Sequence, residues 1–129
     1  MIKNKIFILT ILLFLLLAMI FMSFKNNEII NYKIADKTYR LLVADSESEW
    51  VKGLMDVKEL KNAKGMLFIF PDKKPRTFWN KDTFVDLDVY WILDDKVVGR
   101  DFLPSIAQSN GVVYVSSPVS VNKVVELIK

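Results

Sequence analysis

The sequence of 129 residues contains no cysteine and no histidine, and only four glycines and four prolines. Without cysteine the chain cannot form a disulfide, a thiolate nucleophile, a lipid-modified cysteine or a haem attachment. The absence of both residue types also excludes a cysteine/histidine zinc site and a Ser-His-Asp triad. Side-chain proton transfer is left to Asp, Glu, Lys and Tyr. We therefore expect no metal ion and no cofactor.

The longest segment without a charge covers residues 6–24 and has 19 residues. As a helix it would be roughly 28 Å long, close to the ~30 Å thickness of the hydrocarbon layer of a membrane. A cleaved signal peptide has an apolar core of about 7–15 residues followed by small residues. Here the run is longer and ends in Met-Ser-Phe at 22–24. The segment favours an uncleaved transmembrane anchor, and a removed signal peptide is the alternative.

Basic residues near the ends of this segment predict its orientation. Lys3 and Lys5 lie in a short tip, residues 1–5, that we expect in the cytoplasm. The rest of the chain would then lie outside the cell membrane. Residues 25–31 form a linker that spans about 23 Å when fully extended. The sequence therefore predicts a single-pass protein whose domain, residues 32–129, stays near the bilayer.

The net charge of +3 belongs to the N-terminal part of the chain. Residues 1–27 contain three lysines and no acidic residue, which leaves 15 basic and 15 acidic residues in 28–129. A nucleic-acid-binding domain usually has a basic face. The neutral balance therefore argues against a nucleic-acid partner.

Short strands are expected where β-branched and aromatic residues are frequent, at residues 37–43, 65–70, 86–93, 96–100, 112–116 and 123–128. The run 65–70 is apolar on both alternating faces, which is typical of a strand covered on both sides. In 86–93 the alternation places Leu87, Val89, Trp91 and Leu93 on one face. Asp94-Asp95 predicts a tight turn that joins this strand to 96–100 in a hairpin, and residues 72–74 predict a charged turn between two prolines. Residues 44–56 predict one short helix that bends or ends early at Gly53. The expected fold is mainly β (α+β): a small antiparallel barrel or sandwich with one short helix, preceded by the transmembrane helix.

Several short motifs carry a resemblance to a known family: GLM at 53–55, GMLFIFP at 65–71, FWNKDT at 78–83, LD at 87–88, SP at 117–118 and VVE at 124–126. In this order and spacing they resemble the domain of unknown function 192 family over roughly residues 40–128. The resemblance implies a single, mainly β domain that is often secreted or anchored by one N-terminal helix. It implies no activity, because none is established for the family.

The chain departs from the family pattern at several positions. Asn80 replaces a methionine, Asp86 a proline and Asp95 a glycine, and Trp50 stands where an arginine is common. A family site that used the arginine or the methionine would be altered in this chain.

Polar and aromatic residues are densest in one stretch and at one later carboxylate, and we take these as the candidate ligand-binding residues: Arg76, Phe78, Trp79, Asn80, Lys81, Asp82 and Asp88. The aromatic side chains offer flat apolar area and the polar ones offer directional hydrogen bonds, a combination that suits sugar rings or peptide segments. The alternative is structural: Trp79 belongs to the core, Lys81 pairs with an aspartate, and residues 82–83 close a turn.

Asp86 and Asp88 are the weak candidates for catalysis. They are two residues apart on a predicted strand, so their carboxylates would project from one face about 7 Å apart. Such a pair could perform acid/base chemistry if burial raised one pKa. Two acids on the outer face of a strand can equally be solvated or salt-bridged.

The sequence thus favours a non-enzymatic binding module for an envelope polymer or a membrane-protein partner. A carboxylate-dependent hydrolase that uses Asp86 and Asp88 is one alternative. A structural or assembly subunit of a membrane complex is the other.

Overall fold

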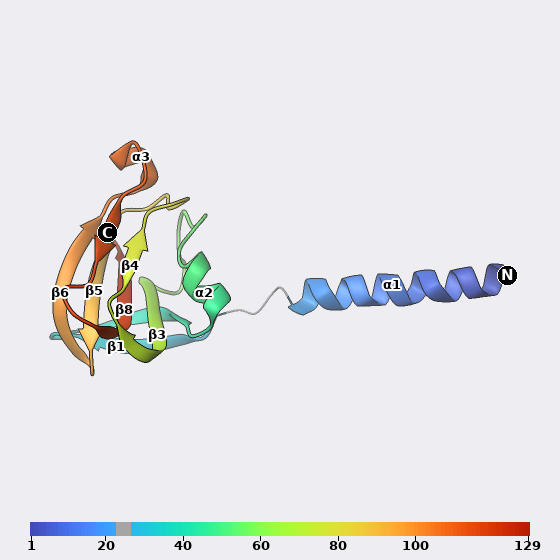
Figure 1. Cartoon of the computed structure of the whole chain (residues 1–129), viewed down its shortest axis with the longest axis horizontal. Helices are drawn as coiled ribbons and strands as arrows, with labels where there is room; N and C mark the ends of the chain where they lie inside the picture. The colour runs from blue at the N-terminus through green and yellow to red at the C-terminus, as the bar shows by residue number, and fades with distance from the viewer. Residues whose placement is uncertain (23–26) are drawn as a thin grey trace.

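The computed structural model describes residues 1–22 and 27–129. Its elements are α1 (Ile2–Met22), β1 (Ile29–Ile34), β2 (Lys37–Ala44), α2 (Glu47–Lys52), β3 (Gly65–Lys74), β4 (Thr77–Trp79), β5 (Leu87–Leu93), β6 (Lys96–Leu103), α3 (Ile106–Ser109), β7 (Tyr114–Ser116) and β8 (Val121–Ile128) (Figure 1). The domain is mainly β, as the sequence predicted.

The main sheet is mixed and open, which corrects the prediction of an antiparallel barrel or sandwich. Its strand order is β1-β2-β3-β8-β5-β6, and β4 pairs with β7 in a second, two-stranded sheet. β2 and β3 are parallel, whereas the other pairs in the main sheet are antiparallel. The long connection between β2 and β3 contains α2, and such a crossover allows two strands to run in the same direction. Among the described strands, β1 and β6 remain the edges of the main sheet.

Two hydrophobic clusters lie on opposite faces of the sheet, because alternate residues of each strand point to opposite sides. On β5, Leu87, Val89 and Trp91 belong to one cluster, and Ile92 belongs to the other. On β3, both alternating faces are buried, which confirms the expectation for residues 65–70. The first cluster also receives α2 and the small sheet through Trp50 and Phe78.

One of the two predicted turns is confirmed. Asp94 and Asp95, with φ of 47° and 65°, join β5 to β6 in the expected hairpin. The predicted helix over 44–56 is shorter, since α2 ends at Gly53, whose φ is 48°. The sequence analysis missed β1 and α3, and it placed a turn at residues 72–74 where β3 continues.

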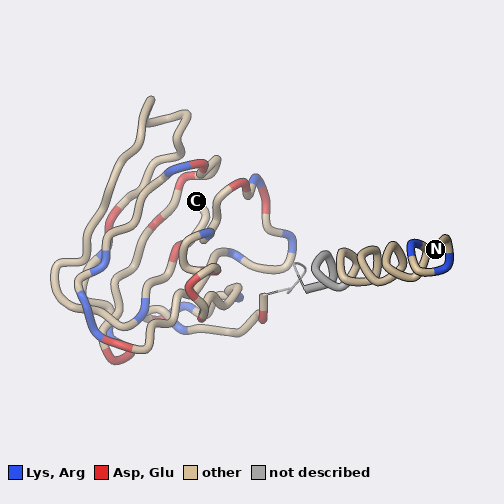
Figure 2. Tube along the Cα trace, turned by 45° about the vertical axis from the view of Figure 1, so that its right-hand side comes forward, with Lys and Arg blue, Asp and Glu red and all other residues tan. Residues whose placement is uncertain are grey.

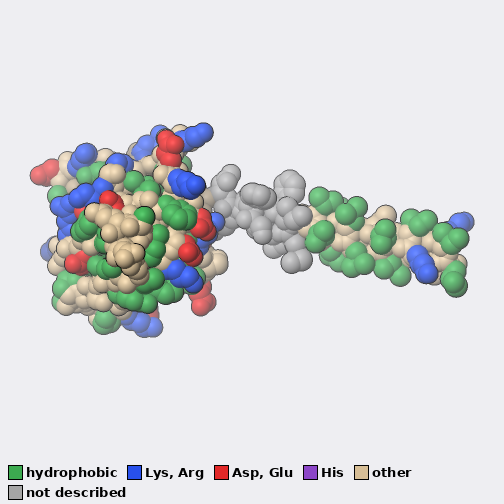
Figure 3. All heavy atoms as spheres, turned by 90° about the horizontal axis from the view of Figure 1, so that it is seen from above, with side chains coloured by type: hydrophobic (Ala, Val, Ile, Leu, Met, Phe, Trp, Pro, Cys, Tyr) green, Lys and Arg blue, Asp and Glu red, His purple; other side chains and the backbone are tan. Residues whose placement is uncertain are grey.

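α1 begins at residue 2, before the predicted anchor, and the face seen in Figure 3 is mostly hydrophobic, with basic side chains near the N-terminal end. Within the described part of the chain, no helix is both long enough and apolar enough to cross a membrane. The predicted span over 6–24 is therefore not confirmed. Residues 23–24 of that span and residues 25–26 of the predicted linker lie outside the described residues.

Candidate functional site

A cleft of about 320 Å³ opens between the end of α2 and β4, over the face of the sheet formed by β3 and β8. Its lining comes from segments far apart in the sequence: residues 50–55, two phenylalanines of β3, the stretch 76–79, Thr83 and Glu126. Most motifs that carry the family resemblance contribute to this one cavity. We therefore take the cleft as the candidate functional site.

Glu126 is the buried carboxyl group of the cleft. It lies on β8 opposite Met66 of β3, and its neighbours on either side point into the other hydrophobic cluster. Its side chain is only 4% exposed, and Oε2 has no hydrogen-bond partner among the described residues. Burial raises the pKa of Glu126 to about 8, because the charged form loses its hydration. Glu126 is therefore mostly protonated at neutral pH.

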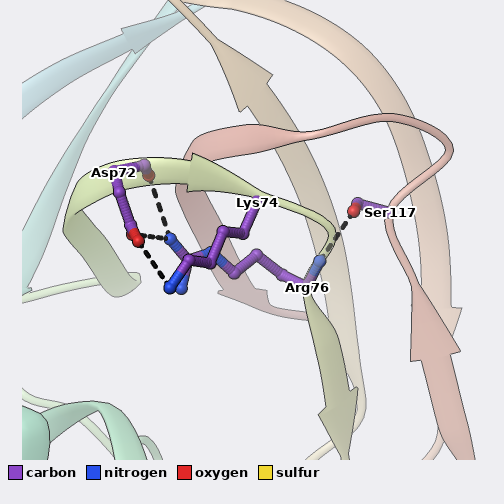
Figure 4. A network of polar contacts seen from close by, with 4 residues as sticks. All are labelled: Asp72, Lys74, Arg76 and Ser117. Atoms are coloured by element: carbon purple, nitrogen blue, oxygen red, sulfur yellow. Dashed lines mark hydrogen bonds and ion pairs between the residues drawn. The ribbon is translucent and has the colours of Figure 1, made fainter.

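Arg76 brings a positive charge to the same cleft. Its guanidinium donates to the carboxylate of Asp72 at 2.5 Å and to the Asp72 carbonyl at 2.9 Å (Figure 4). It also stacks on the ring of Phe70, 3.9 Å from the ring centroid, a contact that Arg makes well. Lys74 pairs with the same carboxylate, and hydrogen bonds from Lys74 and Arg76 lower the pKa of Asp72. The Arg76 Nε is buried without a hydrogen-bond partner among the described residues.

Aromatic side chains form the walls. The rings of Trp50 and Phe70 are 5.0 Å apart, and those of Phe68 and Phe78 meet edge to face at 4.8 Å. The Trp50 indole donates to the carbonyl of Ala44 at 3.0 Å, which fixes its orientation. These contacts fix rigid apolar surfaces around the polar groups.

Gly53 keeps the cleft open above Glu126. Its φ of 48° lies in the left-handed region that side chains rarely adopt. A Cβ at this position would lie 3.3 Å from the ring of Phe68 and 3.8 Å from the unpaired Oε2 of Glu126. The glycine thus both ends α2 and leaves space next to the buried carboxyl.

Three of the predicted ligand-binding residues line the cleft: Arg76, Phe78 and Trp79. Trp79 is 39% exposed and is not a core residue. Lys81 lies 5.3 Å from the centre of the Trp79 ring but does not line the cavity. Asp82 takes part in a backbone contact, because its main-chain carbonyl accepts a hydrogen bond from the backbone N–H of Asp56 at 2.9 Å.

Asn80 is fully buried and has a structural role instead. Its amide group donates to the carbonyl of Pro104 and to the hydroxyl of Ser109, both at 2.8 Å, and its oxygen accepts from the N–H of Val113 at 2.7 Å. It therefore holds the α3 loop against the start of β7. In this chain, Asn80 thus organises a loop and does not line the cleft.

Replacing Asn80 with alanine should lower the free energy of unfolding by about 3 kcal/mol. The substitution removes the side-chain partner of the Pro104 carbonyl and of the Val113 N–H, which both lie in part-buried hydrogen bonds. Losing the partner of a buried polar group costs about 1–3 kcal/mol. Urea denaturation of the full chain measures the loss, with Asn62→Ala at an exposed asparagine as the control. Equal stability of the two variants would contradict the structural role.

The two catalytic candidates lie away from the cleft. Asp88 pairs with Arg100 at 2.7 Å and with Lys129 at 3.7 Å. Asp86 accepts from the backbone N–H of Ser105 at 2.7 Å, next to the start of α3. Both carboxylates therefore have partners that account for their positions. Among the described residues, no cluster of three or more acidic side chains could hold a metal ion.

Sequence reasoning missed the importance of Glu126, which it quoted only as the end of a family motif. A signal was present, because Glu126 is the one acidic residue in the apolar run 124–128. A charged residue inside a strand that is buried on both faces needs either a partner or a function. The contributions of Trp50 and Gly53 could not be found in this way, since they depend on how α2 packs.

The chain was compared with curated proteins and with solved structures. No curated protein matches it. The structure is similar to that of a Sinorhizobium meliloti 1021 protein described as a candidate transcription regulator, at 25% sequence identity and a TM-score of 0.61, with 78% of each chain covered. It is also similar to a protein of unknown function from Novosphingobium aromaticivorans DSM 12444, at 22% identity and a TM-score of 0.64, over 78% of this chain and 73% of that one. At this lower identity the likeness shows the fold alone.

The family assignment rests on a separate comparison. The model of the DUF192 family, described as "Uncharacterized ACR", matches residues 29–128. This range covers the whole β domain, including every motif on which the resemblance was based and the buried glutamate of the cleft. The chain therefore belongs to the domain of unknown function 192 family.

Proposed function

We propose that this protein is a membrane-tethered binding module whose ligand enters the cleft between α2 and β4. One observation carries the proposal: Glu126, a carboxyl group only 4% exposed, lines an aromatic cavity with an oxygen that has no hydrogen-bond partner among the described residues. Leaving a buried polar group unpaired costs about 1–3 kcal/mol. A bound ligand that donates or accepts a hydrogen bond at this oxygen would remove the cost.

Binding is favoured over hydrolysis by the set of groups in the cleft. Glycoside hydrolysis, for example, generally uses two carboxyl groups that flank the bond to be cleaved. Among the described lining residues, Glu126 is the one carboxyl group. Asp86 and Asp88, the predicted catalytic pair, are outside the cleft and have their own partners. The non-enzymatic role thus fits the site best.

The membrane part of the proposal rests on the sequence. Residues 6–24 carry no charge, and Lys3 and Lys5 precede them, a pattern that favours a cytoplasmic N-terminus and a domain outside. A domain in this position would meet envelope polymers and the outer parts of membrane proteins, and we propose these as the source of the ligand. A nucleic-acid ligand is disfavoured, because basic and acidic residues are equal in number in 28–129 and interspersed along the strands (Figure 2).

The three tryptophans allow a direct test. Trp50 and Trp79 line the cleft, whereas the fully buried Trp91 donates its indole N–H to Asp101. The full chain, labelled with ¹⁵N at the indoles and kept in maltoside micelles, is titrated with cell-wall fragments, oligosaccharides, short peptides and aromatic acids. We expect at least one compound to shift the indole resonances of Trp50 and Trp79 and to leave that of Trp91 unchanged. If no compound of the panel shifts either the Trp50 or the Trp79 indole resonance, the binding role is overturned.

A further inference from the structure

The polar groups around the cleft define the chemistry of its ligand, an inference that rests on the proposed function. Within the described part of the chain, Nε of Arg76 is a buried N–H donor without an acceptor, and Oε2 of Glu126 is a buried carboxyl oxygen without a partner. Both residues line the same cavity of about 320 Å³. Two separate elements, β8 and the segment between β3 and β4, thus each contribute to the lining of one cavity a residue that has an unsatisfied polar atom.

We propose that the ligand carries a carboxylate on an apolar, ring-sized body, and that Arg76 and Glu126 bind this carboxylate while the aromatic walls hold the body. Arg76 donates through Nε, and Glu126 donates through its carboxyl O–H. A carboxylate has two oxygens and accepts several hydrogen bonds, so it can satisfy both donors together. The rings of Phe68, Phe78 and Trp79 supply the apolar surface.

The charges that face Glu126 favour an anion. From α2, Lys52 reaches the lining, and from the segment after β3 comes Arg76; the lining residues of β3 and β4 are aromatic or hydroxyl-bearing and carry no charge. Glu126 itself is mostly neutral at pH 7, because burial raises its pKa to about 8. The charged groups of the lining near neutral pH are therefore positive, and Asp72, the partner of Arg76, is not among the lining residues. These positive charges would repel an ammonium ligand. An ammonium group could not stack on the ring of Phe70 either, because Arg76 already covers that ring.

This arrangement makes affinity depend on pH. Once Glu126 ionises, its carboxylate loses the donor proton and repels the carboxylate of the ligand. Only the fraction of protein with neutral Glu126 then binds, so the apparent affinity falls in proportion to that fraction. With a midpoint near pH 8, the affinity at pH 9.5 should be about 30-fold lower than at pH 6.5.

Three probes of similar shape test the proposal: 3-phenylpropionate, 3-phenylpropanol and 3-phenylpropylamine. Each is titrated into the full chain at pH 6.5 and 9.5, and binding is followed by the indole resonances of Trp50 and Trp79, with Trp91 as the internal control. We expect the carboxylate to bind most tightly at pH 6.5 and about 30-fold more weakly at pH 9.5.

Two variants separate the roles of the polar groups. In Glu126→Gln the amide keeps a donor that does not titrate, so binding of 3-phenylpropionate should persist at both pH values. Arg76→Lys keeps the charge but removes the planar Nε–H donor, and its affinity should fall about tenfold. An unchanged Trp91 resonance shows that each variant is folded.

The outcomes distinguish this proposal from the proposed function. Preferential binding of the amine, or affinity for the carboxylate that does not change with pH, would overturn the carboxylate assignment and leave the cleft as a binding site. Failure of all three probes, when another compound of the wider panel shifts Trp50 and Trp79, would do the same. If no compound shifts the Trp50 or Trp79 resonance, both the carboxylate assignment and the proposed binding function are overturned.

Discussion

Replacing Gly65 with alanine should prevent the β domain from reaching its native fold. An added Cβ would lie 1.9 Å from the carbonyl oxygen of Glu126, 2.9 Å from its carbonyl carbon and 3.0 Å from the Cα of Leu127. All three are backbone atoms of β8, so no side chain can rotate away. Gly65 also pairs with Leu41 of β2, so β3 is held between two strands at this point.

The expected loss exceeds that of ordinary overpacking. Extra methylene groups in a core typically cost about 1–3 kcal/mol, because side chains can adjust. Here the strands themselves must separate, and we expect a loss of about 4 kcal/mol or more, which is comparable to the total stability of a small domain. Thermal unfolding of the full chain, followed by tryptophan fluorescence, should show no cooperative transition for Gly65→Ala.

Gly99→Ala is the matched control. A Cβ at Gly99 meets the ring of Pro118 at 2.9 Å and the side chain of Trp91 at 3.2 Å, on the edge strand β6. The loop that carries Pro118 can shift, so we expect a loss of about 1–2 kcal/mol. Wild-type stability of Gly65→Ala would contradict the close approach of β3 and β8.

The free energy of unfolding should fall as the pH rises from about 5 to 8, and Glu126 should account for this fall. Burial raises the pKa of Glu126 from 4.5 to about 8, so between these values the folded chain holds a proton that the unfolded chain has released. Stability then decreases by about 1.4 kcal/mol per pH unit. The contribution of Glu126 is fully present below pH 4.5 and is lost as the pH passes 8.

The composition of the chain isolates this effect. There is no histidine, the side chain that ordinarily titrates in this range. The pKa values of Asp72 and Asp95 are lowered by hydrogen bonds with Lys and Arg side chains. Their contributions to stability are present above the ordinary aspartate range and are lost only in acid. The change in stability between pH 5 and 8 is therefore expected to come from Glu126 and not from these two aspartates.

Glu126→Gln should remove most of the pH dependence, since the amide is neutral throughout. Urea denaturation at intervals between pH 5 and 9 measures the slope, and Glu59→Gln at an exposed glutamate serves as the control. A flat profile in the parent chain, or the same slope in Glu126→Gln, would contradict a buried and neutral Glu126.

Much of the β structure could be predicted because local patterns determine it. The alternation in 86–93 placed Leu87, Val89 and Trp91 on one face, and all three belong to one buried cluster. The Asp94–Asp95 turn and the early end of α2 at Gly53 followed from backbone preferences. The parallel pairing of β2 with β3 could not be predicted in this way, because strand order depends on contacts between distant segments.

The candidate site was predicted in part for the same reason. Arg76, Phe78 and Trp79 lie close together in the sequence and line the cleft, so a local cluster was enough to find them. Asn80 belongs to that cluster, yet its side chain turns into the α3 loop. Glu126 lies far along the chain, and only the register of β8 against β3 brings it to the cavity.

The most direct test of the account is the titration of Glu126 itself. The full chain, with ¹³C in the side-chain carboxyl of glutamate, can be followed by NMR from pH 4 to 10, and Glu126→Gln assigns the resonance. The account predicts a midpoint near pH 8 that moves further upward when a carboxylate probe occupies the cleft. A midpoint near 4.5, the ordinary value for glutamate, would contradict the buried, neutral carboxyl on which the proposed site depends.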